Sequence, residues 1–377
     1  MIHIFLGTKA QLIKMAPIMK ELQERNIEYN FVFSGQHKST ITDIRNDFGL
    51  KEPDIILYSG PDITSIRKMF FWSIKVATLA SQKNSKVWKG DKDGIVLNHG
   101  DTLSTLIGSF SAKLQGLKTA HIESGLRSFN ILHPFPEELT RRLTFSLSDF
   151  FFAPGEWALQ NLSKEKGKKI NTENNTLLDS LNAYQETIEN IEVKIPQYKY
   201  GIVSIHRFEN LFRKKGLLEI IKIIEDISKT KRILFILHKT TEEKLNKYGI
   251  LPRIKSNKNI ELRPRYSYFK FIKLLKNSEF IITDGGSNQE ECYFLGKPCL
   301  IMRKTTERKE GINQNSIISN YDKKIIITMS DSQHESEPAS KQSSSAYTKP
   351  LPYHFAQLQG LTAQQQAEYL EALDNPT

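Results

Sequence analysis

The stretch GIVLNHGDTLSTLIGSFSAKLQGLKTAHIE, residues 94–123, decides the expected fold. Residues 94–101 form a short apolar run that ends in glycine and aspartate, which is typical of a buried strand. Residues 102–116 repeat apolar positions with the period of an amphipathic helix, and residues 118–123 return to a strand pattern. A strand, a helix and a second strand in this order predict two parallel strands joined by a helical crossover.

The same alternation extends along the chain in both directions. In the first half, strand patterns lie at residues 1–7, 28–35 and 149–154, and a helical pattern lies at 12–23. In the second half, strand patterns lie at 200–206, 232–238, 279–286 and 298–302, and helical patterns lie at 216–228, 267–278 and 288–296. We therefore expect an α/β protein with two Rossmann-like, doubly wound domains that face a cleft.

The pattern restarts once, which sets the expected domain boundaries. We expect an N-terminal Rossmann-like domain over residues 1–175 and a C-terminal Rossmann-like, nucleotide-binding domain over residues 176–328. The composition then changes to Ser, Gln and Ala, which predicts an atypical flexible tail over residues 329–377. Within this tail we expect a terminal helix with Thr362 as its N-cap.

Composition favours a cytoplasmic protein without a disulfide framework. Cys292 and Cys299 are the only cysteines among 377 residues, and no window reaches the roughly 18 apolar residues of a membrane span. The formal net charge of +11 fits either a nucleic-acid or membrane partner, or a Lys-rich surface with a site for an anionic ligand. The Lys and Arg residues are scattered rather than clustered, which favours the second interpretation, without nucleic acid and without membrane insertion.

The first candidate site is the loop GTKAQLIKMAP, residues 7–17, which follows a strand and opens a helix. Gly7 permits a tight turn, and the N–H groups at a helix N-terminus attract anions. Lys9 and Lys14 could add positive charge to a phosphate site. The alternative is an ordinary loop with solvated lysines.

The second candidate site is built from carboxylates in the first half. Asp101 and Glu123 each follow a strand, where a carboxylate either caps the next helix or belongs to a site. Glu137 begins a helix after the rigid His-Pro-Phe-Pro segment, and Arg127 and Arg141 are expected to keep the carboxylates charged and placed. Paired carboxylates suit acid and base work. The alternative is a helical surface ion pair between Glu137 and Arg141, four residues apart.

The third candidate site lies in the second half. His206 and Arg207 follow a strand and could bind a diphosphate; the alternative is a capping histidine. The turn at Gly285, Gly286 and Ser287 is expected to form an anion-binding nest of backbone N–H groups. Two further polar side chains complete the set: Glu291 as a ribose acceptor and Arg308 in the following loop.

Taken together, these motifs resemble the UDP-N-acetylglucosamine 2-epimerase family. The matching segments are GTKAQLIKMAP, SGQH (34–37), HGDTLST, HIESGLRS, PFPEELTRRL, NTLLDSL (175–181), SIHRFEN, TDGGSNQEE, LGKP (295–298) and TERKEG. They occur in the family's order over residues 1 to about 325. Ten ordered motifs make a far more specific signal than any single one.

The resemblance implies a GT-B-like fold and an isomerase that converts UDP-N-acetylglucosamine to UDP-N-acetylmannosamine. In the non-hydrolysing type, a base removes the proton at C2 while UDP leaves C1, and UDP then adds back to the 2-acetamidoglucal with a proton delivered to the other face. The scheme needs no metal and no nicotinamide cofactor. The product serves surface polysaccharide such as capsule, and we expect a homodimer.

The resemblance also implies roles for individual residues. The family's catalytic positions correspond to Asp101, Glu123, Glu137 and His206. Positions near the phosphates or the sugar correspond to Lys14, Arg141 and Arg308, the nucleotide turn to Gly286, the ribose contact to Glu291 and the aromatic stacked on uracil to Phe271.

The chain departs from the family's pattern in two turns. Residues 7–11 read Gly-Thr-Lys-Ala-Gln where the family usually has Gly-Thr-Arg-Pro-Glu, so the charge stays while bidentate phosphate contact is lost. Residues 284–287 read Asp-Gly-Gly-Ser instead of Asp-Ser-Gly-Gly. Three alternatives stay open: a hydrolysing 2-epimerase that releases N-acetylmannosamine and UDP, a GT-B glycosyltransferase that uses a UDP-sugar, and a non-catalytic sensor. The GQH and TER motifs favour the non-hydrolysing type, and the three carboxylates argue against the sensor.

Overall fold

The computed structural model describes residues 1–36, 41–61, 63, 66–82, 86–130, 136–306 and 308–322. Within these residues the chain divides into two compact units, with the boundary between Tyr184 and Gln185. The boundary falls nine residues after the expected one because helix α7 (Thr176–Ala183) packs on helix α1 (Lys9–Glu24) of the first unit. Ser180 Oγ donates to the carbonyl of Ile13, at 2.6 Å. The tail predicted over residues 329–377 lies outside the described residues.

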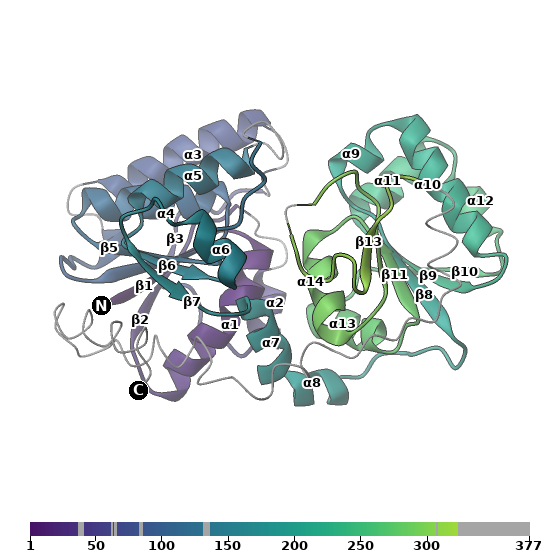
Figure 1. Ribbon diagram of the computed structural model, residues 1–377, viewed down its shortest axis with the longest axis horizontal. Coiled ribbons are helices and arrows are strands. Elements are labelled where there is room, and N and C mark those ends of the chain that lie inside the picture. The colour runs from purple at the N-terminus through teal and green to yellow at the C-terminus, as the bar shows by residue number, and fades with distance from the viewer. Residues whose placement is uncertain are drawn as a thin grey trace. The chain divides into compact units, whose positions relative to one another are not determined.

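The first unit is built on a parallel sheet with the strand order β3-β2-β1-β4-β5-β6-β7 (Figure 1). Its strands are β1 (Ile2–Leu6), β2 (Tyr29–Phe33), β3 (Ile55–Ile56), β4 (Ile95–His99), β5 (Lys118–Ile122), β6 (Phe150–Ala153) and β7 (Lys168–Asn171). The strand order reverses between β1 and β4, which creates the switch point where ligands bind in doubly wound sheets. The carboxyl ends of β1, β4 and β5 lie at or beside this switch point.

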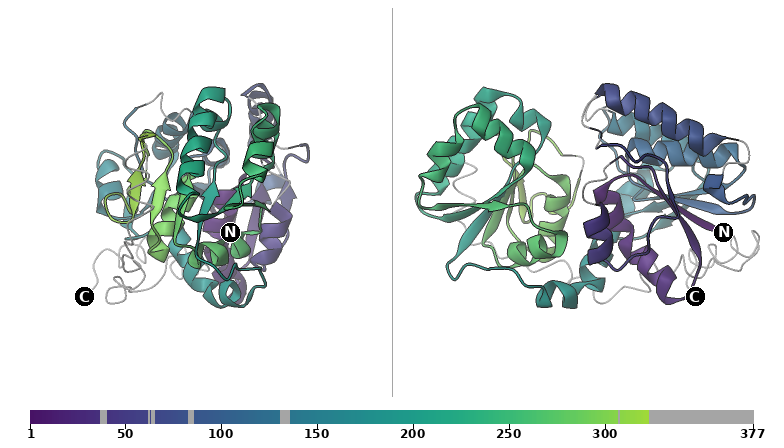
Figure 2. Two further views of the ribbon diagram at one scale, coloured as in Figure 1. Left: turned by 90° about the vertical axis from the view of Figure 1, so that its right-hand side faces the viewer. Right: turned by 180° about the vertical axis from the view of Figure 1, so that it is seen from behind.

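Helices cover both faces of this sheet (Figures 1 and 2). Helices α3 (Ile66–Ser81), α4 (Leu103–Leu114) and α5 (Glu137–Leu147) lie in one layer, with α4 in contact with the other two. Helices α1 and α7 pack together on the opposite face. The core under α3 and α4 is apolar and includes Phe5, Trp72 and Ile107. Two shorter helices, α2 (Ile41–Asp47) and α6 (Glu156–Asn161), and a 3-10 turn at Lys86–Trp88 complete the unit.

The second unit repeats the architecture with the strand order β10-β9-β8-β11-β12-β13, again entirely parallel. Its strands are β8 (Tyr200–Ser204), β9 (Arg232–Leu237), β10 (Ile260–Pro264), β11 (Phe280–Thr283), β12 (Cys299–Ile301) and β13 (Ser316–Ile318). Its helices are α8 (Gln185–Asn190), α9 (Phe208–Leu211), α10 (Lys214–Ile227), α11 (Lys239–Lys247), α12 (Leu251–Lys255), α13 (Tyr268–Lys276) and α14 (Gly286–Leu295). One buried cluster packs α10, α11 and α12 on one sheet face, and a second packs α13 and α14 on the other.

The predicted α/β class with two doubly wound sheets is confirmed. Four strands at or next to sheet edges were not predicted, β3, β7, β10 and β13, because they are short and only partly apolar. The long helix α3 was also missed. No helix within the described ranges is both long and apolar enough to cross a membrane.

Candidate functional site

A glutamine side chain joins the two turns at the switch point of the first sheet. Gln11 Oε1 accepts hydrogen bonds from the backbone N–H groups of Gly7 and Thr8, both at 3.0 Å, and Thr8 caps helix α1 in return. Gln11 Nε2 donates to the carbonyl of His99 at 2.7 Å and to Thr105 Oγ1 at 2.9 Å. The turn after β1 and the turn after β4 are therefore held in one fixed arrangement.

A buried carboxylate lies beside this brace. Glu123 directly follows β5, and its Oε2 forms an ion pair with Lys14 Nζ from the second turn of α1. His99 Nε2 at the end of β4 lies 3.7 Å from the same oxygen. The side chains of Lys14, Glu123 and His99 are only 3%, 3% and 4% exposed. Glu123 adopts a φ of 59°, an uncommon backbone conformation for this residue type that costs free energy and recurs at functional sites.

This contact adds a partner that was not expected for Lys14. The sequence predicted that its ammonium group would contribute to a phosphate site, and this stays a prediction; in the structure the group contacts the buried carboxylate of Glu123. A lysine paired in this way favours the ionised form of its partner. Lys9 is the first residue of α1 and stays half-buried at the helix N-terminus.

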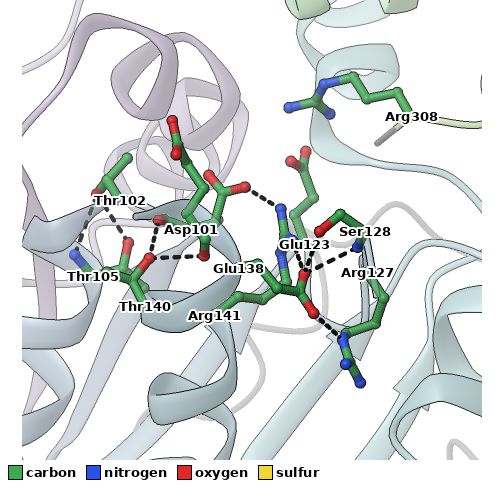
Figure 3. Close-up of polar contacts among 12 residues, drawn as sticks. Asp101, Thr102, Thr105, Glu123, Arg127, Ser128, Glu138, Thr140, Arg141 and Arg308 are labelled. Atoms are coloured by element: carbon green, nitrogen blue, oxygen red, sulfur yellow. Dashed lines mark hydrogen bonds and ion pairs between the residues drawn. The ribbon is translucent and has the colours of Figure 1, made fainter. Parts of the chain in front are cut away.

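A second charged network lies at the same sheet edge (Figure 3). Arg141 on α5 forms ion pairs with Asp101 and, at 2.6 Å, with Glu138 Oε2. Arg127 Nε lies 2.5 Å from the other oxygen of Glu138. The backbone N–H of Ser128 also donates to Glu138, at 2.9 Å. A chain of ion pairs thus runs from Asp101 through Arg141 and Glu138 to Arg127 in the loop after β5. Asp101 is 26% exposed.

Glu138 is the residue that sequence reasoning missed. We expected both arginines to hold Glu123 and Glu137, with Glu137 and Arg141 as the alternative helical pair. The structure instead gives both arginines to Glu138, which is fully buried, whereas Glu137 is half-buried. Burial acts to raise the pKa of Glu138, but the hydrogen bond from the backbone N–H of Ser128, together with Arg127 and Arg141, keeps this pKa below its usual value.

A helical pattern could have found Glu138. It shares a face of α5 with Arg141 and Phe145, three and seven residues later, and Phe145 is buried in the core. Residues 133–135 of the rigid His-Pro-Phe-Pro segment lie outside the described residues.

The loop that carries Asp101 is fixed by a neutral histidine. His121 on β5 is buried, and burial lowers its pKa to about 4. Its Nε2 lies 2.7 Å from the carbonyl of Gly100, so the neutral ring donates a proton there. Its Nδ1 then accepts from Ser124 Oγ, at 3.1 Å.

In the second unit a buried aspartate organises the loop after β8. Asp284 follows β11, is fully buried and accepts hydrogen bonds from the backbone N–H groups of His206 and Arg207, at 3.0 and 2.9 Å. Asn210 Nδ2 donates to the same carboxylate at 2.9 Å. The ring of His206 remains 37% exposed and stacks on His238 with a centroid distance of 4.6 Å. The structure therefore brings the loops of β8 and β11 together, as expected at a switch point.

The glycine turn at 285–287 has a different form from the one predicted. Gly285 is an extended N-cap with φ −84° and ψ 128°, and helix α14 begins at Gly286. The predicted nest is therefore the N-terminus of a ten-residue helix, whose first N–H groups attract anions for a related reason. Gly286 and Ser287 are both partly exposed there.

The remaining predicted residues of this unit lie on or near α14. Glu291 Oε2 accepts from Asn288 Nδ2 at 2.8 Å, and Arg308 forms an ion pair with the buried Glu290. Phe271 on α13 is half-buried and packs against the core cluster of that sheet face. Within the part of the chain that the structure describes, no group of three or more His, Cys, Asp or Glu side chains could hold a metal ion.

Comparison with known proteins identifies the family. The profile of the UDP-N-acetylglucosamine 2-epimerase family matches residues 20–354. The chain belongs to this family. A UDP-N-acetylglucosamine 2-epimerase of Methanococcus maripaludis is 34% identical over 348 residues, which cover 86% of this chain and 89% of the relative. The enzyme of the same name from Campylobacter jejuni is 34% identical over 334 residues, covering 82% and 83%.

Solved structures of the family agree with the fold. The crystal structure of the Methanocaldococcus jannaschii UDP-GlcNAc 2-epimerase in complex with UDP-GlcNAc and UDP has a TM-score of 0.76 and 28% identity, covering 89% of this chain and 95% of that one. The Neisseria meningitidis UDP-GlcNAc 2-epimerase bound to UDP-GlcNAc has a TM-score of 0.71 and 27% identity, covering 99% and 94%. The expected family and GT-B-like fold class are thereby confirmed.

Proposed function

We propose that this protein is a non-hydrolysing UDP-N-acetylglucosamine 2-epimerase. Family membership supports the activity. The observation that carries the proposal is the pair of carboxylates at one sheet edge, Glu123 held by Lys14 and Asp101 held by Arg141. The C2–H bond beside an acetamido group is weakly acidic, so its cleavage needs a placed base and stabilisation of the departing diphosphate.

The reaction that we propose has two stages. A carboxylate among Asp101, Glu123 and Glu137 takes the proton from C2, the C1–O bond to UDP breaks, and 2-acetamidoglucal and UDP form. In the second stage UDP oxygen adds to C1, and an acid on the other face returns a proton to C2. Atoms balance without a redox cofactor or water, and we propose that the product enters surface polysaccharide.

We propose that the second unit binds the nucleotide. The exposed ring of His206 and the N-terminus of α14, at Gly285, Gly286 and Ser287, are suited to the diphosphate. The remaining contacts follow the family's motif: Arg207 and Arg308 on phosphate or sugar, Glu291 on the ribose and Phe271 on uracil. In the first unit, Lys9 at the start of α1 is suited to an anion, and Arg127 and Arg141 act through Glu138.

Product analysis tests this proposal. The protein is incubated with UDP-N-acetylglucosamine, and the sugars are followed by proton NMR. We expect UDP-N-acetylmannosamine with the diphosphate bond intact. Free N-acetylmannosamine together with UDP indicates the hydrolysing type. Transfer only to an added acceptor sugar indicates a glycosyltransferase, and binding without turnover indicates a sensor; each of these results overturns the proposal.

We also propose a homodimer that forms through the outer face of α3, α4 and α5. Helix α4 contacts both neighbours, so their outward side chains share one surface. Seven large apolar side chains are exposed on it: Phe70, Phe71, Ile74, Phe110, Leu114, Leu139 and Leu143. Many exposed large apolar side chains on neighbouring helices are typical of an interaction site, and a face of this composition can pack against its own copy in a two-fold dimer.

Two isoleucines provide a matched test of this surface. Ile74 on α3 and Ile56 on β3 are 50% and 49% exposed. We expect Ile74→Glu to sediment as a monomer and Ile56→Glu to sediment like the wild type. A wild-type monomer, or a dimer that persists in Ile74→Glu, contradicts the proposed interface.

A further inference from the structure

The histidine at the end of β4 is not part of the residue set predicted for the reaction, yet it faces the buried carboxylate. In the register of β4 and β5, His99 lies opposite Ile122. It therefore lies close to Glu123, the residue that follows Ile122. Its Nε2 lies 3.7 Å from Glu123 Oε2, the same oxygen that contacts Lys14. Three elements, α1, β4 and the end of β5, thus direct side chains to one point.

The backbone of His99 is held unusually firmly. Its carbonyl accepts from Gln11 Nε2 at 2.7 Å and from Thr105 Oγ1 at 2.6 Å. The neighbouring N–H of Gly100 donates to the carbonyl of Ile122 at 2.9 Å. Both sides of the turn are therefore fixed by hydrogen bonds, and the His99 side chain itself is only 4% exposed.

The ionisable groups around Glu123 suggest what this imidazole does. Lys14 supplies one positive charge from α1. His121 on β5 interacts electrostatically with Glu123, Asp101 and Arg141, and its low pKa of about 4 keeps it neutral near neutral pH. At 3.7 Å, His99 Nε2 lies beyond hydrogen-bond distance of Glu123 Oε2, so the imidazole acts on the carboxylate electrostatically and by packing against it.

We propose that His99 is a positioning residue for Glu123 that, together with Lys14, orients the carboxylate and favours its ionised form. The inference rests on the proposed function insofar as Glu123 exchanges a proton with substrate. A polar ring nitrogen close to a buried carboxylate affects its ionisation electrostatically, and a fixed orientation is needed for proton transfer. His99 acts through Glu123 and does not itself touch the sugar.

The test compares substitutions of His99 with one at another buried histidine. His99→Leu removes the polar ring nitrogens near Glu123, whereas His99→Gln keeps a polar N–H group in their place. His3→Leu is the control, because His3 is fully buried in β1 and its Nε2 lies 3.0 Å from Asp91 Oδ2 at the opposite end of the strand. If His99→Leu does not fold, His99→Asn places a shorter polar side chain there, farther from Glu123.

Two readouts are measured on each folded variant. The first is the titration of the Glu123 carboxyl carbon by NMR with ¹³C-labelled glutamate, assigned with Glu123→Gln. The second is the acid side of the pH profile of kcat/KM. We expect His99→Leu to move both midpoints to higher pH by about one unit, while His99→Gln and His3→Leu stay near the wild type.

The outcomes separate this inference from the proposed function. Unchanged midpoints in folded His99→Leu, or equal shifts in His3→Leu, overturn the positioning role. A shifted carboxyl titration in a protein that fails to epimerise UDP-N-acetylglucosamine supports the contact and overturns the proposed reaction instead.

Discussion

Arg141 on α5 binds the carboxylate of Asp101, which lies 40 residues earlier at the end of β4. Its other terminal nitrogen binds Glu138, so one buried guanidinium joins the helix to two carboxylates. A planar, permanently charged group suits this bridge, because lysine offers a single point charge. We therefore expect the stability and the proposed chemistry of this sheet edge to depend on the same side chain.

Replacement of Arg141 is the first prediction. Arg141→Met leaves Glu138 buried with one fewer partner, which we expect to lower the free energy of unfolding by about 3 kcal/mol and kcat/KM by at least about 100-fold. Arg142→Met, at the exposed next position, is the control and should change the free energy of unfolding by less than about 0.5 kcal/mol. Urea denaturation and steady-state kinetics measure the two effects. Equal behaviour of the two variants contradicts the bridge.

Asp284 carries the second prediction, which concerns the second unit. Asp284→Asn replaces one acceptor oxygen with a donor that faces backbone N–H groups of His206 and Arg207. We expect the loop to move and UDP to bind roughly tenfold more weakly, since a buried charge-assisted hydrogen bond is lost. Calorimetric titration with UDP measures the change. Glu243→Gln is the control, because Glu243 lies exposed on α11 and a surface substitution of this kind changes little. Unchanged UDP affinity in Asp284→Asn would falsify this role.

His121 yields a prediction on acid stability. The pKa of His121 is about 4 in the folded protein, and its ordinary value of 6.5 applies to the unfolded chain. Between these two pH values the unfolded chain therefore binds more protons than the folded protein. The associated stability is present above pH 6.5 and is lost as the pH falls toward 4, by about 3 kcal/mol. We expect a His121→Gln variant to show a correspondingly smaller loss between pH 6.5 and 4 in urea denaturation. An identical pH dependence in both proteins contradicts a neutral, buried His121.

Asp179 on α7 yields a prediction in which the free energy of unfolding depends on pH in the opposite direction. Burial raises its pKa to about 7 from 3.8, so the folded protein holds the proton more tightly than the unfolded chain. The contribution of Asp179 to the free energy of unfolding is fully present below about pH 4 and is lost as the pH rises to 7. We expect Asp179→Asn to be more stable than the wild type by about 2 to 4 kcal/mol at pH 8, with the difference largely gone at pH 4.

The exposed Asp93 supplies the control for Asp179. Asp93→Asn should change the free energy of unfolding by less than about 0.5 kcal/mol at either pH. An Asp179→Asn variant whose advantage is the same at pH 4 and pH 8 points to packing rather than proton binding.

Much of the fold could be predicted because the interior strands carry continuous apolar runs. Ile95 to Leu97 and Ile281 to Ile282 are examples, since both faces of a parallel strand are covered. The edge strand β13 has a half-exposed Ile317 and only three residues, so its pattern does not differ from that of a loop.

The sequence predicted which residues lie at the candidate site better than it predicted which side chains contact one another there. Asp101 and Glu123 could be found because carboxylates at strand ends of doubly wound sheets gather at one edge. Their partners depend on strand order and helix rotation, which place Lys14 on Glu123 and bring Glu138 inward instead of Glu137. The contact between His99 and Glu123 requires the pairing of β4 with β5, which the alternation of elements alone does not specify.

Solvent exchange at C2 tests the central claim most directly. Wild-type protein, Glu123→Gln and Asp101→Asn are each incubated with UDP-N-acetylglucosamine in deuterated water, and C2 is followed by proton NMR. The account predicts deuterium at C2 of both epimers with the wild type, and loss of exchange in the two variants with UDP affinity retained. Epimerisation without deuterium incorporation, or full exchange in both variants, would contradict it.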